Sequence, residues 1–370
     1  MKYRRMPIEI ESPEQLGYDR IKCNLTESSM PDMKAGLLDV DIAGLLLCYT
    51  DHTGDPALRE IIASEHDAFT PDDVIVTVGA AAALFIVATS LLEPSDHIVV
   101  ARPNYATNIE TPRAIGCGMS LLELEFDSGF RIDTDRLRAL ITPRTKLISL
   151  TSPHNPTGAV MPQNQLLEIA AIAQSHGAFL LVDETYRDMA FSDPIPWAAA
   201  LGPGVISVSS LSKTYGMPGI RTGWILCRNP ELQELFLAAK EQIFICNSVV
   251  DEYLALNLLR RKKETLVQVK KHLETAFGIV RDWMSGQDIL EWVEPRGGVV
   301  CFPRIKADAD VDVDAFYKIL NDEYGTYVGP GHWFEMDRRY MRIGFGWPRR
   351  EELEQGLANI SLALQKATCG

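Results

Sequence analysis

The chain has 370 residues, 46% of them hydrophobic, and a formal net charge of −14 at pH 7. This length exceeds what one simple hydrophobic core needs, so we expect two lobes, or one large domain with a smaller one attached. The acidic balance and the lack of a basic stripe argue against a nucleic-acid-binding protein and favour a soluble one.

Nothing in the sequence predicts export, membrane insertion or a metal centre. Residues 1–14 are charged and contain prolines, so they lack the apolar stretch of a signal peptide. The longest apolar run, residues 80–92, is shorter than the ~18 residues that span a membrane. The seven cysteines form neither a C-x-x-C pair nor a cluster with histidine, which argues against disulfides and a zinc site. We therefore expect a cytoplasmic protein.

Strands and helices alternate through the first two thirds of the chain. Residues 1–40 are polar and irregular, and a helix is expected to begin near Asp55. The β-branched residues 73–78 predict a strand, and an Ala-rich helix follows Gly79. Further elements are predicted as strands at 96–101, 146–150, 178–182, 205–209 and 223–227, and as a helix at 163–176. This alternation indicates an α/β fold: a three-layer αβα large domain with a mostly parallel sheet.

The pattern changes after about residue 240. Long helices are predicted over 250–285, and then a strand at 298–302, a helix at 313–323, a strand at 340–345 and a last helix from Glu351. These elements predict a smaller α+β domain. We expect residues 41–250 to form the large domain, and residues 1–40 and 251–370 to form the small one.

Chemically active groups follow several of the predicted strands, where open α/β sheets bind ligands. Gly79, Ala80 and Ala81 open a helix, and free N–H groups at a helix start favour a phosphate. Asp183 follows an apolar strand and can keep a pyridine nitrogen protonated. Lys213 follows another strand, and burial can give the neutral amine that condenses with an aldehyde. Taken singly, each has an ordinary alternative: a tight turn, a helix cap or salt bridge, or a surface lysine.

Two arginines could bind anions. Arg221, eight residues after Lys213, could neutralise a phosphate or lie on the surface. Arg342 lies inside an otherwise apolar strand, where a guanidinium needs an anion, and a bidentate carboxylate matches it best. The alternative for Arg342 is an internal salt bridge.

Taken together, these motifs resemble the fold-type-I pyridoxal 5'-phosphate (PLP) enzymes of the class I/II aminotransferase superfamily. The matching segments, in chain order, are Tyr49-Thr-x3-Gly54-x3-Leu58-Arg59, Gly79-Ala80, Pro103-x-Tyr105, Pro153-His-Asn155-Pro156-Thr157-Gly158, Asp183-x-x-Tyr186, Ser210-x-Ser212-Lys213, Gly219-x-Arg221-x-Gly223-Trp224 and Arg342. The resemblance implies PLP as cofactor, an amino acid as substrate, and a homodimer with shared active sites.

The resemblance also implies roles around the cofactor ring. Lys213 would hold PLP as a Schiff base and later move a proton at the substrate Cα. Asp183 would pair with the pyridinium nitrogen, which makes the ring an electron sink. Tyr186 and Asn155 would hydrogen-bond the phenolic oxygen of the ring, and Tyr105 would stack on its face.

Further roles follow from the same resemblance for the phosphate and the substrate. Tyr49 would reach the phosphate of the neighbouring subunit, and Arg342 would clamp the substrate α-carboxylate with help from Asn155. The residues implied to hold the phosphate within the subunit are Gly79, Ala80, Ala81, Ser210, Ser212 and Arg221.

Some positions depart from the family pattern. The phosphate turn reads Gly-Ala-Ala-Ala and lacks the usual hydroxyl, although its backbone donors remain. The family usually has a glycine in an N-terminal loop against the substrate, where this chain has Glu27 within residues 24–28. Glu27 could face a cationic substrate side chain or be a solvated carboxylate. His332 could be a second acid or base, or a packed loop histidine, and His154 is given no role.

The motifs favour transamination between an amino acid and a 2-oxo acid. A PLP lyase or cyclase remains the alternative because it uses the same catalytic core to expel a β-substituent or close a ring. Enzymes of the capreomycidine synthase type, which act on a hydroxylated arginine, are one example, and a Glu27 that faces a guanidinium would suit them. A regulatory protein without catalysis is least favoured, because the core residues are intact.

Overall fold

The computed structural model describes residues 1–38, 40–192 and 196–368. Its helices are α1 (Pro7–Ile10), α2 (Pro13–Leu16), α3 (Pro56–Ala63), α4 (Gly79–Leu91), α5 (Ala106–Ile115), α6 (Thr134–Leu140), α7 (Gln163–Ser175), α8 (Pro230–Phe244), α9 (Val249–Arg260), α10 (Lys262–Ser285), α11 (Val313–Lys318) and α12 (Arg350–Ala367). Its strands are β1 (Cys23–Leu25), β2 (Val74–Val78), β3 (His97–Arg102), β4 (Gly118–Glu123), β5 (Thr145–Thr151), β6 (Phe179–Asp183), β7 (Val205–Ser210), β8 (Thr222–Cys227), β9 (Leu290–Glu291), β10 (Val300–Cys301), β11 (Arg304–Ile305), β12 (Thr326–Pro330) and β13 (Met341–Gly344).

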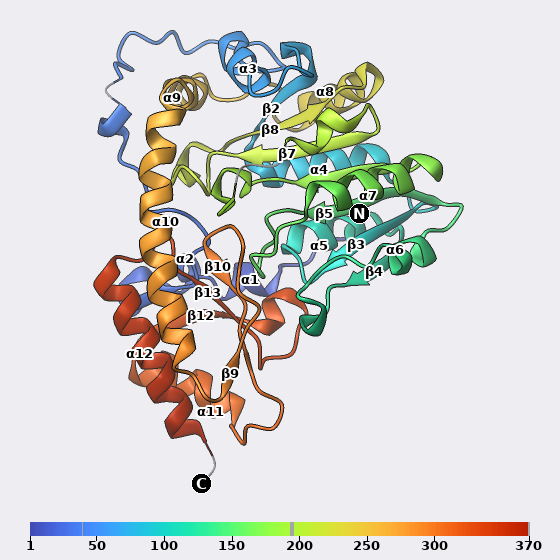
Figure 1. Ribbon diagram of the computed structural model, residues 1–370. Coiled ribbons are helices and arrows are strands. Elements are labelled where there is room, and N and C mark those ends of the chain that lie inside the picture. Colours follow the sequence, from blue (N-terminus) through green and yellow to red (C-terminus); the bar gives the residue numbers. More distant parts are fainter. Residues whose placement is uncertain (39, 193–195, 369–370) are drawn as a thin grey trace.

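A seven-stranded sheet forms the centre of the large lobe (Figure 1). Its strand order is β2-β8-β7-β6-β5-β3-β4, and every neighbouring pair from β7 to β4 is parallel. Only β8 runs antiparallel to its two neighbours, β2 and β7. Because parallel strands end at the same edge of a sheet, the loops after β5, β6 and β7 converge there. The predicted α/β fold with a mostly parallel sheet is confirmed.

Helices cover both faces of this sheet. On one face, α4, α5 and α8 pack on the strands through a cluster that includes Ile86, Ile109 and Phe236. On the other face, α6 and α7 pack through a cluster that includes Leu137 and Ile169. A strand that is covered on both faces has no polar side, which explains why β6 reads as an unbroken apolar run up to Asp183.

The small lobe is built on a mixed four-stranded sheet, β1-β12-β13-β10. Its core also contains apolar residues of α10, α11 and α12, among them Leu273, Phe316 and Leu357. In Figure 1, α10 extends from the large lobe into the small lobe, where it lies beside α12. The N-terminal helices α1 and α2 lie with this lobe. The domain boundaries proposed at residues 41 and 250 stay a prediction.

Sequence patterns did not predict α5, β4, α6, α8, β12 or the two N-terminal helices. The sequence of α5 includes Pro112, a residue that normally argues against a helix interior. Similarly, β4 begins with Gly118 and lacks a strong alternation of apolar and polar residues. Such elements form because the neighbouring sheet supplies packing that their own residues do not indicate.

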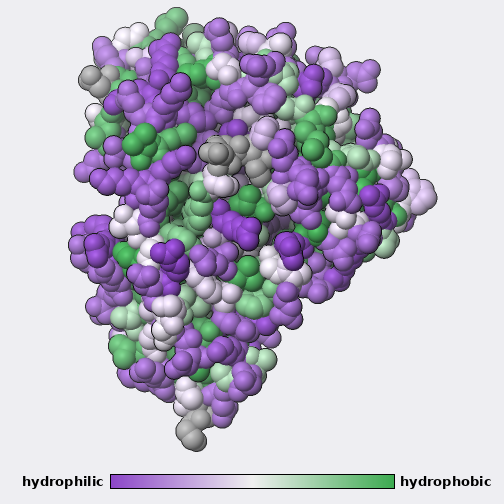
Figure 2. Space-filling view, viewed as in Figure 1, coloured by the Kyte–Doolittle hydropathy of each residue, from purple (hydrophilic) through white to green (hydrophobic). Residues whose placement is uncertain are grey.

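The surface is largely polar. Hydrophilic side chains cover most of the face shown in Figure 2. Among the described residues, no helix is both long and apolar enough to cross a membrane. The six cysteines within the described ranges are free, and Cys369 lies outside them.

Candidate active site

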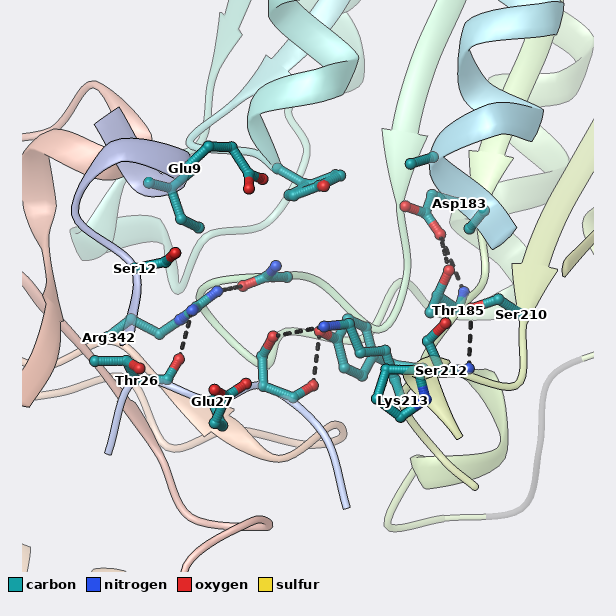
Figure 3. Close-up of a pocket in the computed structure, with 18 of the residues that line it drawn as sticks. Glu9, Ser12, Thr26, Glu27, Asp183, Thr185, Ser210, Ser212, Lys213 and Arg342 are labelled. Atoms are coloured by element: carbon teal, nitrogen blue, oxygen red, sulfur yellow. Dashed lines mark hydrogen bonds between the residues drawn. The ribbon is translucent and has the colours of Figure 1, made fainter. Parts of the chain in front are cut away.

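One pocket lies at the edge where β5, β6 and β7 end, against the small lobe (Figure 3). It brings together most of the residues that the sequence indicated. Those that line it are Glu27, Ala80, Ala81, Tyr105, Asn155, Asp183, Tyr186, Ser210, Ser212, Lys213, Arg221 and Arg342. Two predicted site residues do not line it: Gly79 lies beneath Arg221, and the side chain of Tyr49 is 79% exposed elsewhere.

Lys213 presents its amine to this pocket. Its Nζ donates a hydrogen bond of 3.3 Å to Oγ of Ser28, and its carbonyl accepts one of 2.9 Å from the backbone N–H of Met30. Burial lowers the pKa of Lys213, although the charges of Tyr105 and Glu27 oppose the shift. A lowered pKa favours the neutral amine, which is the nucleophilic form.

Asp183 ends β6 and is buried. Its Oδ1 accepts hydrogen bonds from the backbone N–H of Thr185 at 3.1 Å and from Oγ1 of Thr185 at 2.6 Å. Burial raises the pKa of Asp183 despite these bonds and the nearby charge of Lys213. A buried carboxylate with no ion-pair partner among the described residues suits a ligand that brings a positive charge to it.

An anion-binding cradle lies at the start of α4. The backbone of Gly79 has φ +76°, and a Cβ at this position would lie 2.6 Å from Nη2 of Arg221. Nη1 of Arg221 donates to the carbonyl of Pro218 at 2.8 Å and to Oγ of Ser212 at 3.4 Å. The first N–H groups of α4, the serine hydroxyls and the guanidinium thus suit a phosphate, although the turn has no hydroxyl of its own.

Arg342 lies in β13 and reaches the pocket from the small lobe. It is 4% exposed, its Nη1 donates to Oδ1 of Asn155 at 3.0 Å, and its Nη2 donates to the carbonyl of Thr26 at 2.6 Å. Its Nε has no partner, and no described Asp or Glu forms an ion pair with it. The alternative of an internal salt bridge therefore finds no support, and a buried, uncompensated guanidinium suits a carboxylate ligand.

Tyr186 donates a hydrogen bond of 3.0 Å from its hydroxyl to the carbonyl of Ser28. Burial raises the pKa of Tyr186 to about 12, so the phenol keeps its proton and remains a donor. Together with the bond from Arg342 to Thr26, this bond holds the backbone on both sides of Glu27 against the pocket.

Sequence patterns missed an N-terminal part of the pocket wall, formed by Ile8, Glu9, Ser12, Pro13 and Glu14. Between these residues, Oε2 of Glu11 accepts hydrogen bonds from Nε2 of His332 at 2.8 Å and from Nε1 of Trp333 at 2.7 Å. Trp333 lines the pocket, whereas His332 does not. The only sequence signal for this wall was the pair of prolines at helix starts, Pro7 and Pro13, which gives no position in space.

His154, to which no role was given, is buried beside Asn155. Its Nδ1 lies 2.8 Å from Oγ1 of Thr157, and burial lowers the pKa of His154 to about 4. The imidazole is therefore neutral at physiological pH, and it packs outside the pocket wall.

The residues present fit one particular cofactor shape. An amine poised as a nucleophile, a buried carboxylate and an anion cradle line a single pocket, as a phosphorylated pyridine aldehyde requires. A sheet edge with these groups defines a PLP-binding α/β enzyme.

Comparisons with known proteins agree with this reading. The family model for aminotransferase class I and II matches residues 23–360. The capreomycidine synthase of Streptomyces vinaceus is 32% identical over 83% of this chain and 78% of its own length. The arginine–pyruvate transaminase of Pseudomonas aeruginosa is 30% identical over 77% of this chain and 74% of its own.

A solved structure agrees equally well. The crystal structure of a PLP-dependent aminotransferase from Streptococcus suis has a TM-score of 0.92 at 29% identity, and the match covers 100% of both chains. The chain belongs to the class I and II aminotransferase family, and it is a PLP-dependent enzyme of fold type I.

Proposed function

We propose that the protein transfers an amino group between an amino acid and a 2-oxo acid, with Lys213 as the residue that binds PLP. The observation that carries this proposal is the position of Lys213, Asp183 and Arg342 in one pocket. The first would hold the cofactor, the second would pair with its ring and the third would hold the substrate carboxylate. When bound, PLP supplies an electron sink that stabilises negative charge at the substrate Cα.

The chain's own residues then have separate tasks. The ionised Asp183 stabilises a protonated ring nitrogen, because opposite charges in a buried site favour the charged forms. Arg342 and Asn155 fix the α-carboxylate and so orient the Cα–H bond. Burial lowers the pKa of Lys213 and so favours its neutral amine, which would accept the proton from Cα and could return it elsewhere.

The N-terminal wall completes the site. Glu11 holds residues 7–16 against Trp333, so they form part of the pocket wall on the small-lobe side. A wall that reduces the contact of the pocket with water strengthens the electrostatic interactions of Asp183 and Arg342 with their ligands.

A single-turnover experiment tests the proposed reaction. The PLP-loaded enzyme is mixed with an amino acid in the absence of any 2-oxo acid. A transaminase releases at most one equivalent of a 2-oxo acid per active site and then stops until an oxo acid is added. Lys213→Ala should release none, and a lack of 2-oxo acid from the wild type with every amino acid tested would refute the proposal.

A lyase or cyclase is the second candidate. It is favoured by the 32% identity to an enzyme named capreomycidine synthase and by the position of Glu27 in the pocket wall, where a basic, arginine-like side chain could reach it. The same experiment separates the two reactions. Continuous release of ammonia or of a cyclised product without an added oxo acid identifies the second.

We also propose that the active form is a homodimer in which the two subunits share their active sites. We propose that this dimer is cytoplasmic. The segment before Tyr49 exposes several large apolar side chains, namely Leu37, Ile42, Leu46 and Leu47. Their exposure supports burial against a second copy, which would bring Tyr49 to the phosphate of its neighbour. Analytical ultracentrifugation and PLP titration of Tyr49→Phe test this, and a monomer that binds PLP at full affinity would contradict it.

A further inference from the structure

Three carboxylates share one side of the pocket. Glu9 lies on α1, Glu14 on α2, and Glu27 in the segment that follows β1. Figure 3 shows Glu9 and Glu27 on the same side as Arg342 and opposite Asp183. None of the three forms an ion pair with a described Lys, Arg or His side chain.

Glu27 is held firmly in this wall. The carbonyl of Thr26 before it accepts the bond from Arg342, and the carbonyl of Ser28 after it accepts the bond from Tyr186. Oγ of Ser28 also accepts a bond from Lys213. The position of the Glu27 side chain is therefore tied to the same residues that would hold the cofactor and the substrate carboxylate.

The carboxylate of Glu27 is only half satisfied. Its Oε1 accepts hydrogen bonds from the hydroxyl of Tyr18 at 3.3 Å and from Nδ2 of Asn24 at 3.4 Å. Its Oε2 accepts none from the described residues. Burial, and next the charge of Glu14, raise the pKa of Glu27, whereas Lys213 and Arg342 lower it. A ligand cation placed here would relieve the repulsion between the two carboxylates.

Glu9 and Glu14 stand at the exposed mouth of the pocket. Their segment is fixed between them by Glu11, which accepts the bonds from His332 and Trp333, and by the buried Pro13. Their carboxylates can therefore add negative potential at a fixed place in the pocket. Because both are exposed, solvent screens their attraction for a cation more than it screens that of Glu27.

Two further observations indicate what kind of ligand these carboxylates would bind. Arg342 is buried, lines the same pocket and has an unpaired Nε, which calls for a carboxylate ligand. Among the described residues, no group of three or more His, Cys, Asp or Glu side chains is arranged to hold a metal ion. A molecule with a carboxylate for Arg342 and a cationic group for the nearby Glu27 would satisfy both kinds of side chain on this side of the pocket.

We propose that the substrate is an amino acid whose side chain ends in a guanidinium or ammonium group, and that Glu27, with Glu9 and Glu14 at the mouth, selects it. This inference rests on the proposed function for the orientation of the substrate. It holds for either reaction, because it concerns the side chain and not the bond that breaks.

The test compares arginine with citrulline, which has nearly the same shape but a neutral ureido group. Isothermal titration calorimetry of the PLP-loaded enzyme measures the Kd of both. We expect arginine to bind at least about tenfold more tightly, with a preference that falls as salt is added. Glu27→Gln should remove most of the preference, and the Gln triple variant at 9, 14 and 27 should abolish it.

The matched control is Glu274→Gln, at an exposed position of α10, which should keep the wild-type preference. Equal binding of the two amino acids to the wild type, or an undiminished preference in Glu27→Gln, would overturn the inference. If the triple variant does not fold, the arginine preference of Glu27→Gln and the salt dependence of the wild type still test the inference. Failure of the proposed transamination looks different: arginine is still preferred in binding, but no 2-oxo acid is released.

Discussion

Arg342 in β13 donates a hydrogen bond of 3.0 Å from Nη1 to Oδ1 of Asn155, which lies in the loop after β5. The bond joins the small lobe to the large one at the pocket. The guanidinium that we propose to bind the substrate carboxylate is thus oriented by the lobe that carries Lys213 and Asp183, before any ligand binds. Such orientation reduces the entropy that substrate binding must overcome.

Arg342→Lys should lower the catalytic efficiency of the enzyme with amino acid substrates. A lysine keeps the charge but cannot bind Asn155, Thr26 and a bidentate carboxylate together, so we expect kcat/KM to fall roughly 10- to 100-fold, mainly through KM. Steady-state kinetics measure the change. Arg338→Lys, an exposed arginine of the same lobe, is the control and should leave both constants unchanged. An unaltered KM in Arg342→Lys would exclude the carboxylate role.

Asp183→Asn should stabilise the PLP-free protein while impairing the loaded enzyme. Because burial raises the pKa of Asp183, the folded PLP-free chain binds more protons than the unfolded one at pH values just above the ordinary carboxyl pKa. Its stability therefore falls as pH rises through that window, and the loss persists at neutral pH. Asparagine removes this loss and can still accept the bonds from Thr185.

Thermal melts of the PLP-free wild type and Asp183→Asn at several pH values test the prediction. We expect the variant to melt higher at pH 7, by on the order of 2 °C, with a smaller difference at pH 4. In the loaded enzyme, turnover should drop by roughly 100-fold or more, because the ring loses its counter-charge. If the PLP-free variant melted at a lower temperature than the wild type at pH 7, the buried charge of Asp183 would not destabilise the folded protein, and the prediction would be wrong.

Gly79→Ala should reduce the affinity for PLP. A Cβ at this position meets Nη2 of Arg221 at 2.6 Å, and φ +76° costs a residue with a side chain about 1 kcal/mol. Displacement of the guanidinium should weaken PLP binding about tenfold, as measured by titration of PLP into the stripped protein. Gly278→Ala in α10, where a Cβ meets nothing within 4 Å, should leave PLP affinity unchanged. Equal affinities in the two variants would place the phosphate elsewhere.

Glu11→Ala should loosen the N-terminal wall. It removes the acceptor of both His332 and Trp333, and each lost hydrogen bond is worth about 1 kcal/mol. We expect faster amide hydrogen exchange in residues 7–16 and a roughly threefold to tenfold higher KM for the amino acid. Glu274→Ala is the control. Unchanged exchange in residues 7–16 would mean that other contacts hold the segment.

The sequence by itself indicated the large sheet and the residues that follow its strands. The strand that ends at Asp183 is an unbroken apolar run, and the strand before Lys213 is rich in valine and isoleucine, so both can be recognised in the sequence. The resemblance to one family then related Asp183, Lys213 and Arg342, which lie far apart in the chain, to a single site. Their local patterns alone left a helix cap, a surface lysine and an internal salt bridge as alternative readings.

Only the tertiary structure placed α1 and α2 beside the pocket and Glu9 and Glu14 in its wall. Helices of four residues are too short to be stable alone, so no local pattern specifies where they dock. The contacts that hold them, from Glu11 to His332 and Trp333, join residues more than 300 positions apart. A charged residue in a polar segment looks solvated in the sequence, and only its neighbours in space decide whether it faces water or a ligand.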